Sequence, residues 1–177
     1  GQLQCITGTG DTLTTVDDSP KCELVSSHSG SVMVASIYSH RINWSAIGDY
    51  KSWTHDNYDS SSAQWVDVGY KDQGAIVSVS FLSKSIIVYK QYGKAYQIMG
   101  NPHDGTLTVY PLSETAFCDG ESISVDDRSY YLGNSGFMSL TPTDTYADIQ
   151  PFETGININT MLIRQLGSGA RLFHVVS

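Results

Sequence analysis

Residues 75–110 read AIVSVSFLSKSIIVYKQYGKAYQIMGNPHDGTLTVY, and this stretch decides the fold class. Its runs of β-branched and aromatic residues are separated by short polar segments, a pattern typical of antiparallel strands joined by turns. The segment Asn101-Pro102-His103-Asp104-Gly105 has strong turn chemistry, because Pro presets φ and Gly accepts positive φ. The stretch therefore predicts one unit of consecutive strands, which cover residues 75–81, 85–90, 94–99 and 107–110.

The same pattern recurs along the chain at a spacing of 44 residues. A shift of this size places four serines in one column: Ser36, Ser80, Ser124 and Ser168. The residues six and eight places after each serine are two positions apart, so they are expected on the same face of a strand. The other copies predict strands over residues 31–36, 41–45, 122–125, 129–132, 137–140, 159–165 and 171–176, and one short helical turn is predicted over 144–150.

A four-stranded unit of about 40–50 residues has the size of a β-propeller blade. The sequence therefore predicts an all-β protein, a β-propeller or partial propeller of about four blades. The alternative is a β-sandwich in which one register is periodic by chance. We expect a single domain over residues 1–177, with the blades over 20–177 and an N-terminal segment, 1–19, that matches no repeat.

Composition and charge exclude several classes of partner. The formal net charge is −8, and nucleic-acid recognition usually requires a basic face. No apolar stretch approaches the roughly 20 residues that span a bilayer.

The three cysteines, Cys5, Cys22 and Cys118, form no CxxC pair, which favours free thiols over a disulfide framework or zinc site. A bridge between Cys5 and Cys22 stays open as an alternative.

The sequence contains no recognisable catalytic or metal-binding motif. Its five histidines form no HExxH or HxH pair, and no Gly-x-Ser-x-Gly elbow occurs. His103 lies beside Asp104, but a surface turn uses the same residue types. The oxygen-rich stretch 56–62 lacks EF-hand spacing and is interpreted as a solvated loop. We therefore expect no enzyme activity, no catalytic residues, no cofactor and no metal.

Several motifs, taken in their order, resemble a known family. Arg41-Ile42-Asn43-Trp44-Ser45 is followed by Gly48-Asp49 and Trp53, and later come Tyr96 to Gly100, Tyr130 to Gly133 and Tyr146 to Gln150. This series is similar to stretches of phage tail-tube, nozzle and stabilisation proteins. The resemblance covers roughly residues 20–160 and implies a propeller-like domain without a catalytic site.

The resemblance also implies a role and a place. It suggests a structural component of a bacteriophage or prophage tail or head–tail machine, located in the virion after assembly in the bacterial cytoplasm. Its partners would be other tail subunits, and the full-length protein would form a homo-oligomer. Because the chain is shorter than a complete protein of this kind and opens with Gly1, we expect it to be a fragment of a longer one.

Five residues are predicted to anchor loops or form interactions: Trp44, Asp49, Trp53, Trp65 and Tyr92. For the three tryptophans we expect mostly packing. Aromatic residues beside Asp or Asn would also suit a carbohydrate-binding module, so a glycan is an alternative partner. A glycan-cleaving enzyme would need two carboxylates facing one cleft, and the sequence selects no such pair.

Overall fold

The computed structural model describes residues 1–6, 12–36, 39–72, 74–82, 85–91, 94–112, 122–133, 136–142 and 149–153. This part of the chain contains fourteen strands and no α-helix, which confirms the all-β prediction. Within it, no helix is long and apolar enough to cross a membrane.

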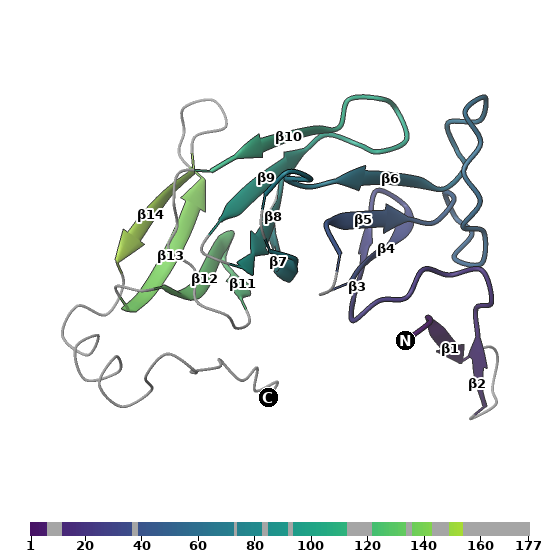
Figure 1. Ribbon diagram of the computed structural model, residues 1–177, viewed down its shortest axis with the longest axis horizontal. Helices are drawn as coiled ribbons and strands as arrows, with labels where there is room; N and C mark the ends of the chain where they lie inside the picture. Colours follow the sequence, from purple (N-terminus) through teal and green to yellow (C-terminus); the bar gives the residue numbers. More distant parts are fainter. Residues whose placement is uncertain are drawn as a thin grey trace. The chain divides into compact units, whose positions relative to one another are not determined.

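The strands form four antiparallel sheets (Figure 1). A two-stranded sheet pairs β1 (Gln4–Ile6) with β2 (Leu13–Thr15). In the other three, each strand pairs with the next along the chain. These four-stranded sheets consist of β3 (Leu24–His28), β4 (Ser31–Ala35), β5 (Arg41–Trp44) and β6 (Gln64–Asp67); of β7 (Ile76–Leu82), β8 (Ser85–Lys90), β9 (Ala95–Met99) and β10 (Thr108–Pro111); and of β11 (Ile123–Val125), β12 (Arg128–Gly133), β13 (Gly136–Pro142) and β14 (Ile149–Glu153).

The chain divides into two compact units. Unit 1 comprises Gly1–Tyr70 and Gly100–Leu107, so it includes the β9–β10 loop. Unit 2 comprises Lys71–Met99 and Thr108–Ser177. The expectation of a single domain stays a prediction.

In unit 2, a shift of 44 residues aligns β7–β10 with β11–β14 strand for strand. In the first sheet the same shift aligns β4 with β7 and β5 with β8, each one strand out of order, whereas β6 aligns with β10 in the same place. The sequence pattern missed β3 and β6, whose alternating residues are at most half-buried and therefore lack a continuous apolar run.

Two further predictions differ from the structure or fall outside it. The helical turn over 144–150 is wrong at its end, because Ile149 and Gln150 begin strand β14 and pair with β13. Residues 144–148 and both strands predicted after residue 158 lie outside the described residues. Ladder pairing with β13 overrides the local turn preference of this segment.

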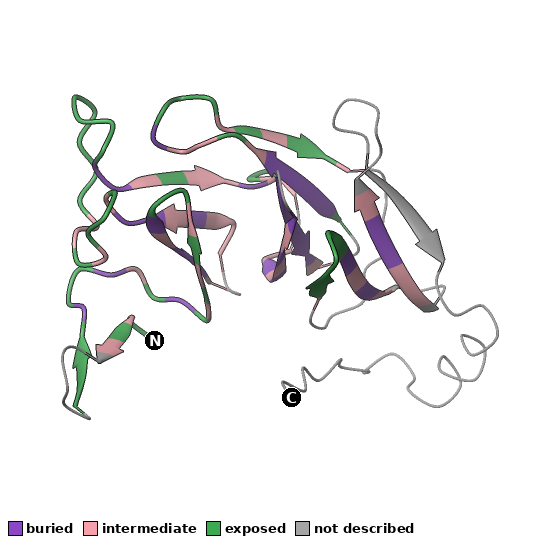
Figure 2. Ribbon diagram, turned by 180° about the vertical axis from the view of Figure 1, so that it is seen from behind, coloured by how far each residue is buried: buried purple, intermediate pink, exposed green. Residues whose placement is uncertain are grey.

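The core of unit 2 lies between its two four-stranded sheets. Leu82, Ile87 and Tyr89 from one sheet pack against Tyr131 and Leu140 from the other. The side chains of β8 are buried on both faces (Figure 2), which explains its continuous apolar run.

Hydroxyl groups join these two sheets beside the apolar core. Tyr89 Oη lies 2.7 Å from Ser129 Oγ, which donates to Ser80 Oγ at 2.7 Å. Ser80 donates to Ser122 Oγ at 2.6 Å, and Ser122 Oγ lies 2.7 Å from Ser78 Oγ. We call these five residues the hydroxyl chain. Ser78 and Ser122 stand 44 positions apart, so the repeat places equivalent serines in contact.

Candidate interaction surface

Trp44 packs inside unit 1. Its side chain is fully buried at the end of β5, and its indole nitrogen donates to His28 Nδ1 at 3.2 Å. Because indole is only a donor, His28 Nδ1 must be unprotonated in this contact. Burial, and secondly the charge of His103, lower the pKa of His28, which favours the neutral ring. The packing role predicted for Trp44 fits this environment.

Trp53 and Asp49 organise the loop that follows β5. The Trp53 indole donates to the Tyr50 carbonyl at 2.8 Å, and the Asp49 carboxylate accepts from the Lys51 amide at 2.9 Å. Gly48 has φ +70° in the turn closed by the Ala46–Asp49 bridge. Both predicted residues therefore hold the loop in shape through contacts within it. Tyr92, the remaining predicted anchor outside the strands, lies outside the described residues.

Trp65 has a different environment from the other two tryptophans. It lies on β6, the outer strand of its sheet, and is 48% exposed. The guanidinium of Arg41 lies over the indole ring, with Cζ 3.8 Å from the ring centroid. Arg41 also donates to both carboxylate oxygens of Asp67, at 2.7 and 2.9 Å. Trp65 therefore lies at the surface and stacks on Arg41, and the packing role expected for it stays a prediction.

The register of β5 and β6 explains this arrangement. Arg41 pairs with Asp67 and Asn43 pairs with Trp65, which places all four side chains on one face of the sheet. The hydrogen bond to Arg41 lowers the pKa of the Asp67 carboxyl, and the same bond raises the pKa of Arg41. We call these four residues the Trp65 platform. The pairing of Arg41 with Asp67 could not be predicted from the sequence, because no strand was expected where β6 lies.

His103 was assigned to a surface turn, but the structure buries it. Its Nε2 lies 2.7 Å from Ser31 Oγ, and its Nδ1 lies 3.1 Å from the Ser60 carbonyl. A carbonyl accepts only, so Nδ1 carries the proton and Nε2 accepts from Ser31. This is the hydrogen-bond pattern of a serine nucleophile and its base. Ser31 and His103 are each only 5% exposed, however, so the pair serves to fasten the β9–β10 loop within unit 1.

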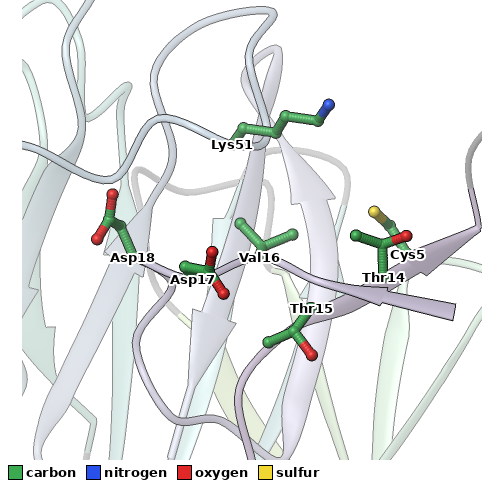
Figure 3. Close-up of a pocket in the computed structure, with 7 residues that line it drawn as sticks. All are labelled: Cys5, Thr14, Thr15, Val16, Asp17, Asp18 and Lys51. Carbon is green, nitrogen blue, oxygen red and sulfur yellow. The ribbon is translucent and has the colours of Figure 1, made fainter.

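An open pocket of about 280 Å³ lies beside the β1–β2 sheet (Figure 3). Asp17 and Asp18 contribute carboxylates from one segment, and Lys51 contributes its side chain from the loop after β5. Within the described residues, no group of three or more His, Cys, Asp or Glu side chains could hold a metal ion.

Two of the cysteines can be placed. Cys5 is partly buried and Cys22 is buried, and both are free thiols, so the alternative bridge between them is not formed. Burial is the largest cause raising the pKa of the Cys22 thiol. Cys118 lies outside the described residues.

Comparison of the sequence with protein-family models and with curated proteins finds no match.

Proposed function

We propose that this chain is a propeller-like structural module of a bacteriophage or prophage tail or head–tail machine. It acts as a protein–protein interaction scaffold without catalytic activity and works within the virion after assembly in the bacterial cytoplasm. Its partners are other tail subunits, and its full-length form is a homo-oligomer. The ordered motifs that resemble tail-tube, nozzle and stabilisation proteins are the basis of this assignment.

The observation that carries the proposal is the packing of unit 2. Two four-stranded antiparallel sheets, whose equivalent strands are related by a shift of 44 residues, pack together, and the equivalent serines Ser78 and Ser122 meet between them. Repeated units that bury each other's faces are the building principle of blades and solenoids. Such an interior suits a rigid mechanical part.

The contacts made by the family-like motif also support an architectural role. Arg41 pairs with Asp67, Trp44 binds His28, and Trp53 binds a loop carbonyl. Ser45 Oγ accepts from the amide of Val32 in the neighbouring strand region at 3.0 Å. These motif side chains thus hold the fold together, as expected in a scaffold.

Purified virions provide the direct test. A lysogen or infected culture carrying this gene is induced, particles are banded by density, and proteins are identified by mass spectrometry. We expect the chain at a fixed ratio to the major tail proteins, while a non-virion replication protein from the same phage is absent. Particles that lack the chain, or a gene without terminase, portal and tape-measure neighbours, would contradict the proposal.

A further inference from the structure

We propose that the Trp65 platform binds a neutral sugar ring, which stacks on the exposed Trp65 indole. This goes beyond the scaffold role and does not depend on the phage assignment. The site consists of Trp65, Arg41, Asp67 and Asn43, all on one face of the β5–β6 pair.

The indole is stacked on Arg41 and is still accessible. The Arg41 guanidinium lies over the ring at 3.8 Å from its centroid, yet 48% of Trp65 remains exposed to solvent. A stacked aromatic side chain that is still half-accessible is a rigid apolar platform with little rotamer entropy left to lose on binding. The CH-rich face of a pyranose ring is flat and of matching size.

The Trp65 indole is held in place before any ligand binds. The two parallel hydrogen bonds to Asp67 fix the plane of the Arg41 guanidinium, and the guanidinium in turn supports the ring. Such preorganisation reduces the ordering that binding would otherwise require.

Polar groups surround the indole. Asp67 uses two of the five N–H donors of Arg41, whose side chain is 43% exposed, and Asn43 lies directly across from Trp65. Guanidinium and amide groups beside a ring can exchange hydrogen bonds with ring hydroxyls.

The charge of the platform and of the whole chain favours an uncharged ligand. The carboxylate of Asp67 neutralises Arg41 within the platform, so the site offers no uncompensated positive charge for an acidic ligand. The chain as a whole carries a formal charge of −8, which repels anions at longer range. The expected ligand is therefore an uncharged hexopyranose unit.

Tryptophan fluorescence tests the proposal on the full 177-residue chain. The probes are methyl α-D-glucopyranoside and methyl β-D-galactopyranoside, with sorbitol as an open-chain polyol that lacks a ring face. We expect a saturable signal change with a millimolar Kd for at least one glycoside and none for sorbitol. Methyl glucuronide should bind at least about tenfold more weakly, because its carboxylate meets the acidic chain.

Variants assign the binding to the platform. Because Trp65→Ala also removes the fluorescent reporter, the variants are compared by isothermal titration calorimetry. Trp65→Ala should abolish the saturable binding heat, and Arg41→Lys should weaken binding about tenfold because Lys cannot keep the planar, doubly hydrogen-bonded stack. Tyr58→Ala is the matched control, since Tyr58 is 99% exposed on the loop before β6 and should bind like wild type. Circular dichroism confirms that each variant is folded.

Four outcomes would overturn the inference. They are equal responses to glycosides and sorbitol, a saturable response that persists in folded Trp65→Ala, binding of the glucuronide alone, and binding of none of the probes. Virion proteomics would still decide the scaffold role separately.

Discussion

At the level of single residues, His28 determines how its contact with Trp44 responds to acid. The half-buried His28 accepts a hydrogen bond from the Trp44 indole through Nδ1. An indole N–H cannot act as an acceptor, so protonation of His28 Nδ1 disrupts this contact.

We predict acid destabilisation through His28. Its folded-state pKa lies below its ordinary value of 6.5, so the unfolded chain binds the proton more readily. The contribution is complete above pH 6.5 and decreases as the pH falls through 6.5 toward the folded-state pKa. Urea unfolding at several pH values measures it. His28→Gln, whose amide oxygen can still accept from Trp44, should lose less stability between pH 7 and 5 than wild type; an identical slope would contradict the assignment.

Gly100 has a backbone conformation and surroundings that a residue with a Cβ atom could not adopt without strain. It has φ +89°, and a Cβ atom there would overlap the carbonyl of Thr106 in the same loop. We predict that Gly100→Ala lowers the free energy of unfolding by more than about 2 kcal/mol, from the left-handed φ and the clash together. Gly105→Ala, which has φ +75° but open space, is the control and should lose less. Equal losses in denaturant titrations would show that the clash does not matter.

At the scale of elements, the hydroxyl chain determines how the two sheets of unit 2 meet. Ser80 on β7 bonds both Ser122 and Ser129, and the Ser124 hydroxyl accepts from the Phe81 amide at 3.0 Å. Small hydroxyl side chains allow the two sheets to approach closely and satisfy each other's hydrogen-bonding groups. An apolar pair of the same size would pack but would not fix the register of the two sheets. Two serines of the 44-residue column, Ser80 and Ser124, therefore contribute hydrogen bonds between these sheets.

We predict that Ser80→Ala lowers the free energy of unfolding by about 1–3 kcal/mol, since it leaves the buried hydroxyl of Ser129 without this acceptor. Ser27→Ala, on an exposed position of β3, should change stability by less than about 0.5 kcal/mol. A double-mutant cycle of Ser80→Ala and Ser129→Ala should show a non-zero coupling energy. Additive effects would mean that the chain of hydroxyls does not act as a unit.

At the scale of the whole molecule, charge sets the partners that the chain avoids. Eighteen acidic and ten basic side chains give a formal charge of −8. A scaffold lining or flanking a DNA path would benefit from this sign, because an acidic surface does not adhere to phosphates.

We predict that the full chain does not retain double-stranded DNA in a filter-binding assay, even at about 50 mM salt, where non-specific electrostatic binding is strong. A basic DNA-binding protein of similar mass serves as the positive control. Retention that decreases as salt is raised would show a basic patch that the net charge conceals.

Alternation and Gly/Pro punctuation are local properties, so the all-β class, the strands of the middle repeat and the turn residues could be predicted from the sequence. Strands 85–90 and 31–35 lie where the pattern predicts them. Three features became visible in the fold alone: the strands β3 and β6, the burial of His103 against Ser31, and the position of Arg41 and Asp67 beside Trp65. Those features depend on which strands become neighbours, and residues far apart in the chain acquire their partners only when the sheet forms.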